Sequence, residues 1–446
     1  NFMAGENTQR CADILKLIGY NYAERLYDEH HAAHPEWKIY GSETCSTLQS
    51  RGIYHFPYEQ PVLTDDDLQC SVLGNTTTSW GAKDIPFILE FEAGCDFSAG
   101  QFIWTGIDYI GEPTPYTTKN SYFGMCDTAG FPKDSYYLFQ AAWREKKKEE
   151  PVLHLYPYWD WNPGQMIDLI AASDAAEVEV LVNGKSLGRK ALDPAAGKVL
   201  AHFKAPYEEG EAEAIAYDAE GREIARTTES SFGDAAEICL AAEAEKLRPG
   251  DLAFISISMR DEEGNLTANA NNEVYCEVAG PARLLGLDNG DSTDYDPYKT
   301  NRRRLFSGKL LAVLEPEGAG EIRFTVSSPG LLPKTLRLIA EEGDYPTPQL
   351  PLIREEASQP ADVPIRKLEL RTDAARRITP AKQRFTIEAK AKPANATYRD
   401  IDWRITNVRG ADSLIAELKK DPADPFRAEV KVKGDGDFTV RCLPKS

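Results

Sequence analysis

Three short stretches of the sequence place polar or aromatic side chains at the ends of apolar segments that have the composition of β-strands. The residues concerned are Asn21 and Tyr22, Glu43, and Trp104 and Asp108. If the segments are parallel strands of an α/β barrel, their carboxyl ends form one face, where catalytic groups collect. A carboxylate there can attack an anomeric carbon, a tyrosine hydroxyl can orient that carboxylate, and an indole can stack on a sugar ring. These residue types therefore indicate a carbohydrate site centred on Glu43.

Simpler explanations exist for the same residues. Glu43 follows the apolar stretch KIYGS and could cap a helix or be a solvated loop acid, and Trp104 could belong to a core. His55 and Glu112 lie in the loops after these segments, where they could contact a leaving group or support the site. A loop histidine or glutamate is more often a solvated surface residue.

Residues 1–148 alternate predicted strands with predicted helices. Strands are expected within 13–23, 38–43 and 100–110, and helices within 24–36, 83–93 and 133–150. This alternation is typical of a parallel α/β barrel or sheet. Three strands are too few to close a barrel, so the region is predicted to be part of one.

After Pro151 the pattern changes to short alternating strands separated by turn residues. The Asn183-Gly184 pair inside 176–192 is the strongest hairpin signal, and residues 211–228 repeat the design. The predicted divisions are Ig-like β-sandwiches at 151–233 and 235–341, a Pro-rich acidic linker at 342–362 and a further all-β domain at 363–446.

The composition argues against several classes of partner. The chain has 446 residues and a formal net charge of −20, which would repel nucleic acid and anionic lipid. No apolar run approaches the ~20 residues of a membrane span. The eight cysteines show neither a CxxC pair nor zinc-ligand spacing, so buried free thiols in a reducing, cytoplasmic setting are expected. A neutral partner such as a sugar fits this chain better than nucleic acid or a membrane.

Several motifs together resemble one family of glycosidases. LIGYNYAERLYDEHHAAHPEWKIYGSETCS followed by GQFIWTGIDYIGEPTPY is similar to the C-terminal end of the catalytic barrel of glycoside hydrolase family 2 β-galactosidases, and GFPKDSYYLFQAAWR to its last helix. The segment LLGLDNGDSTDYDPYK is similar to a loop of an accessory β-domain, and residues 363–446 resemble a bacterial Ig-like module. The resemblance implies the C-terminal part of a (β/α)8 TIM barrel followed by three Ig-like β-sandwich domains.

The resemblance also implies roles for individual residues. Glu43 matches the catalytic nucleophile of a retaining β-galactosidase, and Tyr22 the hydroxyl beside it. Trp104 matches the indole lining the sugar subsite, while Asn21 and Asp108 are expected substrate contacts. Members of the family are often helped by Mg²⁺ or Na⁺, although the sequence commits no residues to either ion.

One part of the family pattern is missing. A retaining enzyme needs a second carboxyl ~5–5.5 Å from the nucleophile, which the family carries in a Gly-Asn-Glu motif earlier in the chain. No such motif precedes Glu43. We therefore expect a C-terminal portion of a longer enzyme, inactive alone, partnered by the missing N-terminal portion or by a second copy in a homo-oligomer.

Two functional alternatives remain open. The same mechanism could act on β-glucuronides or β-mannosides, although Arg51 and Lys119 do not form an evident clamp for a glucuronate. Alternatively, the β-domains could form a non-catalytic carbohydrate-binding or adhesion protein.

Three further segments have predicted structural roles. The acidic residues 288–296 are expected to form an ordered polar loop rather than a cation site, and the basic run 301–306 a salt-bridging surface. The aromatic cluster 156–164 is expected at the seam between the barrel and the first sandwich.

Overall fold

The computed structural model describes residues 11–60, 68–73, 84–144, 150–348, 350, 352–355, 362–374, 377–408 and 410–445. The chain divides into two compact units, Asn1–Ser230 and Ser231–Ser446. The predicted linker 342–362 lies partly outside the described residues. Among the described residues, the search for a helix with the length and hydropathy of a membrane span found none.

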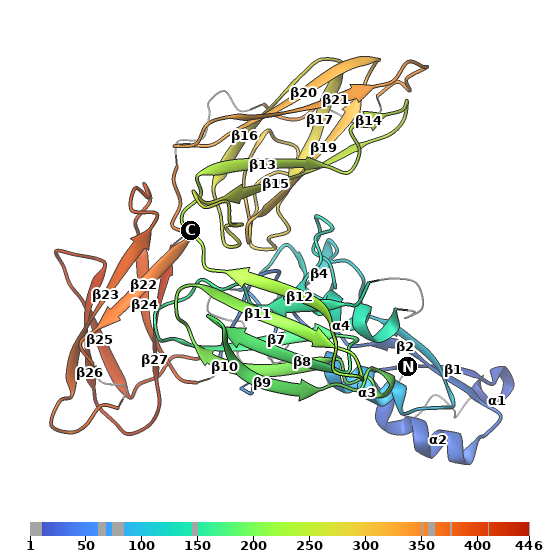
Figure 1. Ribbon diagram of the computed structural model, residues 1–446, viewed down its shortest axis with the longest axis horizontal. Coiled ribbons are helices and arrows are strands. Elements are labelled where there is room, and N and C mark those ends of the chain that lie inside the picture. Colours follow the sequence, from blue (N-terminus) through green and yellow to red (C-terminus); the bar gives the residue numbers. More distant parts are fainter. Residues whose placement is uncertain are drawn as a thin grey trace. The chain divides into compact units, whose positions relative to one another are not determined.

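The first unit contains a parallel three-stranded sheet in the order β1-β2-β3, of which Figure 1 labels β1 and β2. The strands are β1 (Leu17–Asn21), β2 (Lys38–Thr44) and β3 (Ser98–Ile103). The helix α2 (Tyr27–Ala33), preceded by the 3₁₀ turn η2 (Glu24–Leu26), lies between the first two strands in sequence, and α3 (Ile85–Ala93) between the last two. The predicted alternation of strand and helix is confirmed for this part of the chain.

Several predicted boundaries were wrong; the strand expected within 100–110, for example, is β3 and spans Ser98–Ile103. Residues Cys11–Leu15 form a short helix, α1, where a strand was expected from residue 13. The N–H of Lys16 donates to the carbonyl of Ala12, and Lys16 then turns into the left-handed region with φ 54°, which ends α1 before β1 begins. The helix α4 (Asp134–Trp143) ends before the predicted residue 150, and residues 145–149 lie outside the described part.

Local chemistry explains where α3 begins. The Asp84 carboxylate accepts a hydrogen bond from the Phe87 N–H, and Pro86 lies in the first turn, where its missing N–H costs nothing. The helix buries Ile85, Ile88 and Leu89. These side chains belong to a core shared with residues of α4 and of the first β-sandwich.

The first β-sandwich completes the first unit. Its two sheets run in the orders β10-β7-β6 and β12-β11-β8-β9. The strands are β6 (Leu153–Tyr156), β7 (Met166–Ser173), β8 (Glu177–Val182), β9 (Lys185–Ala191), β10 (Leu200–Pro206), β11 (Glu211–Tyr217) and β12 (Glu223–Ser230), with a 3₁₀ turn η3 (Pro194–Ala196). The hairpin predicted at Asn183-Gly184 is confirmed, and both residues have the positive φ that such a turn requires.

The aromatic cluster 156–164 divides between two environments. Trp159 is fully buried in the sandwich core. Trp161 stacks on Tyr158 and contacts the rings of Tyr54 and Phe56, which belong to the segment that follows β2. These contacts confirm that part of the cluster forms the seam between the first segment and the sandwich.

The second unit contains two further β-modules. The sandwich that follows residue 231 has sheets in the orders β13-β15-β19-β17 and β14-β21-β20-β16-β18. Its strands are β13 (Glu237–Ala242), β14 (Lys246–Leu247), β15 (Ala253–Arg260), β16 (Glu273–Ala279), β17 (Ala282–Asp288), β18 (Arg302–Arg304), β19 (Lys309–Pro316), β20 (Gly320–Ser327) and β21 (Lys334–Ala340). The last module has sheets in the orders β22-β23-β26-β25 and β24-β27. Its strands are β22 (Lys367–Thr372), β23 (Arg384–Lys392), β24 (Ile401–Thr406), β25 (Ala416–Lys420), β26 (Arg427–Val432) and β27 (Thr439–Pro444).

The basic run 301–306 was expected on the surface, and for Arg303 this was wrong. Its side chain is completely buried, and its Nε lies 3.0 Å from Asp294 Oδ2. Its Nη1 also donates to the carbonyls of Leu287 and Asp296. The acidic loop 288–296 is therefore ordered by an arginine of the same module, as its predicted structural role requires.

The cysteines are free thiols. Cys45, Cys70, Cys95 and Cys276 are buried as expected, but Cys11 is exposed.

Candidate active site

The ends of β1 and β2 bring the predicted nucleophile and its neighbours together. Asn21 is the register partner of Glu43, and the N–H of Tyr22 donates to the carbonyl of Glu43 at 3.0 Å. Close packing of the strands requires glycine at Gly19, since a Cβ there would lie 2.7 Å from the Oγ of Ser42. The strand register thus places Tyr22 beside the Glu43 carboxylate.

The Tyr22 side chain joins Glu43 to a second hydroxyl. Its O–H donates to Glu43 Oε2 at 3.2 Å. The Tyr22 hydroxyl oxygen also forms a hydrogen bond with Ser46 Oγ. Burial raises the pKa of Tyr22 well above its usual value, the bond to Ser46 acts against this, and the negative charge of Glu43 adds to it. Tyr22 therefore remains a protonated donor at any physiological pH, which is what an ionised nucleophile beside it requires.

Trp104 directly follows β3 and is tied to the end of β2. Its backbone N–H donates to the carbonyl of Thr44 at 2.8 Å. Its indole Nε1–H donates to the hydroxyl of Tyr109 at 3.1 Å, and the Tyr109 hydroxyl donates to Glu112 Oε2 at 2.6 Å. The Trp104 and Tyr109 rings meet edge to face, with centroids 5.8 Å apart.

The Asn21 side chain is bonded to a serine of the neighbouring strand. The Ser42 hydroxyl donates to Asn21 Oδ1 at 2.6 Å. That bond fixes the amide beside the end of β2, next to Glu43 in the strand register. A substrate contact from Asn21 remains a prediction.

The surroundings of Asp108 argue against its predicted role as a substrate contact. The residue is only 4% exposed, and its Oδ1 accepts hydrogen bonds from the Lys133 ammonium at 2.8 Å and the Gly124 N–H at 2.7 Å. Burial raises its pKa to about 7, and the interaction with Lys133 opposes that rise. We therefore assign Asp108 to a buried ion pair that fixes the loop after β3.

Two residues of the site were missed by the sequence reasoning. Ser46 and Tyr109 both lie inside the two long motifs that resemble the glycosidase barrel, but neither had a predicted role. Ser46 forms a hydrogen bond with the Tyr22 hydroxyl, and the Tyr109 hydroxyl accepts from the Trp104 indole. The His55 N–H donates to the hydroxyl of Ser71, and no described contact links it to Glu43.

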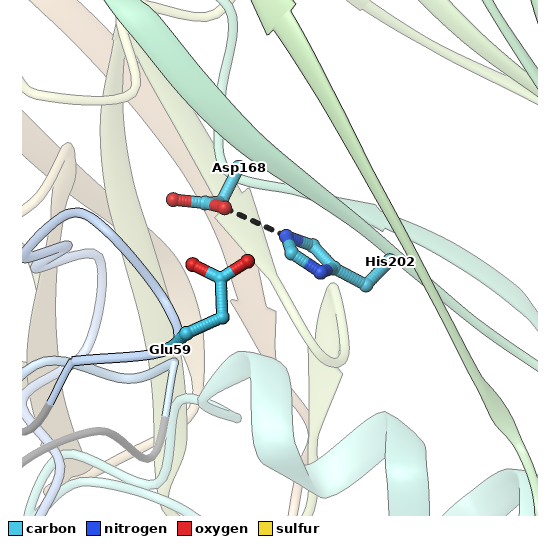
Figure 2. Close-up of side chains that lie close together, drawn as sticks. All are labelled: Glu59, Asp168 and His202. Atoms are coloured by element: carbon cyan, nitrogen blue, oxygen red, sulfur yellow. Dashed lines mark hydrogen bonds and ion pairs between the residues drawn. The ribbon is translucent and has the colours of Figure 1, made fainter.

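One cluster has the donor set of a metal site. Figure 2 shows the carboxylates of Glu59 and Asp168 facing each other beside the imidazole of His202. The Lys204 ammonium lies 2.7 Å from Glu59 Oε2 and 3.3 Å from Asp168 Oδ1. Burial disfavours the charged form of Asp168, but hydrogen bonds from His202, the Tyr58 N–H and Lys204 outweigh it and lower the Asp168 pKa. The Lys204 ammonium thus already contacts both carboxylates, so a metal ion would have to compete with it for these oxygens.

Comparison with known proteins relates the chain to a family of glycosidases. A family model described as glycoside hydrolase family 2 C-terminal domain 5 matches residues 238–337, and a domain of unknown function matches residues 164–225. The chain is 37% identical to a β-galactosidase of Bacteroides ovatus over 346 residues, which are 74% of this chain and 40% of that protein. It is 32% identical to a putative β-glucuronidase of Formosa agariphila over 364 residues, covering 72% of this chain and 34% of the relative.

A solved structure agrees with this relationship. A β-glycosidase from Bacteroides vulgatus superposes with a TM-score of 0.64 at 26% identity, covering 73% of this chain and 45% of that one. The chain resembles members of glycoside hydrolase family 2 over about three quarters of its length, and its residues 238–337 match a C-terminal domain of that family. It spans less than half the length of the relatives it matches.

Proposed function

We propose that this chain carries the nucleophile half of a retaining β-galactosidase, with Glu43 as the attacking carboxylate. The observation that carries the proposal is the Tyr22–Glu43 hydrogen bond at the ends of two parallel strands. The choice of galactose rests on the 37% identity to a protein named as a β-galactosidase.

The proposed reaction has two steps. A Glu43 oxygen attacks the anomeric carbon of the β-galactoside, the bond to the leaving-group oxygen breaks, and a galactosyl ester forms on Glu43. Water then attacks the same carbon and restores the carboxylate. Tyr22 holds the attacking oxygen in place through its hydroxyl, and the indole of Trp104 supplies an apolar face for the sugar.

The proposed mechanism needs a carboxyl acid that the described residues around Glu43 do not supply. The acid must protonate the leaving oxygen and later activate water, contributing typically 10²–10⁴-fold. We place it on a partner segment that extends the β1-β2-β3 sheet into a closed barrel. The outer position of β1 and β3 in that sheet supports this, as does the exposure of Leu17 (57%) and Phe102 (68%).

Trapping of the covalent intermediate tests the nucleophile directly. The chain, alone and together with the segment that completes the barrel, is incubated with 2-deoxy-2-fluoro-β-D-galactosyl fluoride and digested for mass spectrometry. Fluoride leaves with little acid assistance, so the nucleophile is tested even where the acid is absent. An adduct on the peptide containing Glu43, lost in Glu43→Gln, supports the proposal. Absence of label from the completed barrel contradicts it and leaves the non-catalytic carbohydrate-binding alternative.

A β-glucuronide is the second candidate, because one relative is named as a putative β-glucuronidase. Recognition of the glucuronate would need an available cation near the site. Arg51 is committed to Asp127 in a buried ion pair at 2.6 Å, and Lys133 to Asp108. These pairings favour the neutral galactoside, and the corresponding 2-fluoroglucuronyl fluoride gives the comparison.

A further inference from the structure

The Tyr109 side chain links two residues of the loop that follows β3. Its hydroxyl accepts from the indole Nε1–H of Trp104 at 3.1 Å and donates to Glu112 Oε2 at 2.6 Å. Tyr109 thus connects the indole assigned to the sugar subsite with the carboxylate of Glu112.

The direction of these hydrogen bonds is determined by chemistry. Burial and the bond to Glu112 raise the pKa of Tyr109 to about 12, so the phenol keeps its single proton. An ionised carboxylate can only accept, so that proton points to Glu112. The lone pairs of the oxygen are left for the indole, which can only donate. Trp104 therefore has one favourable orientation of its N–H edge.

The Tyr109 backbone is itself held in place. Its N–H donates to Ser121 Oγ at 3.2 Å, and the Ser121 N–H returns a bond to the Tyr109 carbonyl at 3.1 Å. Ser121 is fully buried in β5 (Asn120–Ser121), and the Tyr109 and Trp104 rings pack on a cluster that includes Tyr122 and Phe123. The backbone and the ring of Tyr109 are therefore fixed, and with them the position of its hydroxyl.

Glu112 is held in an unusual backbone conformation. It lies in β4 (Gly111–Thr114) with φ 43°, in the left-handed region that residues other than glycine rarely adopt. Its side chain is exposed, so its bond to Tyr109 is not a consequence of burial. Such conformations persist where the surroundings determine them, often at functional sites.

We propose that Tyr109 is a positioning residue, which orients the Trp104 indole so that its face receives the sugar bound at Glu43. The inference rests on the proposed glycosidase function, because it assigns Trp104 to the sugar subsite. Tyr109 itself acts through Trp104 and need not touch the substrate.

The first test uses the chain as it is and needs no activity. The indole N–H resonances of the ¹⁵N-labelled chain are recorded by TROSY NMR, and Trp104→Phe identifies the Trp104 signal. Tyr109→Phe should shift that signal and accelerate its exchange with solvent, with the other indole signals in place. Tyr116→Phe, in the turn between β4 and β5 and 89% exposed, is the matched control and should change nothing. An unmoved Trp104 signal in Tyr109→Phe overturns the inference.

The second test measures the consequence for the sugar. Inactivation by the fluorogalactosyl fluoride is followed over a range of concentrations in the completed barrel, which separates the binding constant from the rate of trapping. Tyr109→Phe should weaken binding roughly tenfold, because the indole loses the hydrogen bond that holds it in the sugar-binding orientation, with little change in the trapping rate. Equal loss of both constants, or no change in binding, refutes the positioning role.

The two proposals fail in different ways. Absence of label in the unmodified protein contradicts the glycosidase function and, with it, the sugar-directed role of Tyr109. Labelling of the unmodified protein with unchanged binding in Tyr109→Phe leaves the glycosidase function intact and removes the positioning role alone.

Discussion

The Asp108–Lys133 pair allows a quantitative test of how the loop after β3 is held. Lys133 is completely buried, and its ammonium contacts Asp108 Oδ1 at 2.8 Å and the carbonyls of Gln49 at 2.7 Å and Tyr122 at 3.2 Å. Lys133→Met removes all three donors and leaves a buried carboxylate. The expected loss at pH 8 is about 3–5 kcal/mol in the unfolding free energy of the first unit.

The loss should depend on pH in a defined direction. The Asp108 pKa in the folded protein is raised from 3.8 to about 7. The stability that Asp108 contributes is therefore present at low pH and is lost as the pH rises through 7. At pH 5 Asp108 is protonated and needs no counter-charge. The loss of stability in Lys133→Met should then be only that of leaving the carbonyls of Gln49 and Tyr122 without a donor, about 1–3 kcal/mol. The penalty therefore grows between pH 5 and pH 8.

Urea unfolding at both pH values measures this penalty. Tryptophan fluorescence reports chiefly on the first unit, because Trp403 is the one tryptophan beyond residue 230. Lys185→Met, on an exposed position of β9, is the matched control. The double variant Asp108→Asn with Lys133→Met should recover part of the loss. A penalty that is equal at both pH values, or additive in the double variant, would refute the assigned ion pair.

Three further outcomes are expected. Tyr22→Phe removes the hydrogen bond to a charged oxygen, so trapping at Glu43 should slow roughly 10- to 100-fold while Tyr40→Phe stays near the unmodified rate. Burial and the charge of Asp134 raise the pKa of Glu229 from 4.5 to about 8, so stability is lost as the pH rises through this range. Glu229→Gln should abolish that loss, seen as a smaller fall in Tm between pH 5 and pH 9. Chelation by EDTA should leave Tm unchanged because the Lys204 ammonium already contacts the Glu59 and Asp168 carboxylates, whereas Lys204→Met should lower Tm and make it responsive to Mg²⁺. A Tm that falls with EDTA in the unmodified chain would contradict the assignment of Lys204.

Local patterns were sufficient for much of the fold. The Asn183-Gly184 turn was predictable because positive φ at two successive residues is a property of those residue types. The strand–helix alternation before residue 110 was predictable because apolar periodicity differs between strand and helix. The start of β1 was not, since the short helix Cys11–Leu15 shares its apolar composition with the strand that was expected.

The sequence by itself determined which residue types stand at the ends of β1, β2 and β3, and hence that Tyr22, Glu43 and Trp104 would share one edge of a parallel sheet. Parallel strands bring their carboxyl ends together whatever the rest of the protein does. Only the tertiary structure decided the environments of Asp108 and Tyr109, two adjacent residues of one loop. Asp108 turns inward to Lys133, 25 positions later in the chain, whereas Tyr109 turns to Trp104 and Glu112. Such neighbours differ in role because a buried charge needs a partner, and that partner can be far away in the sequence.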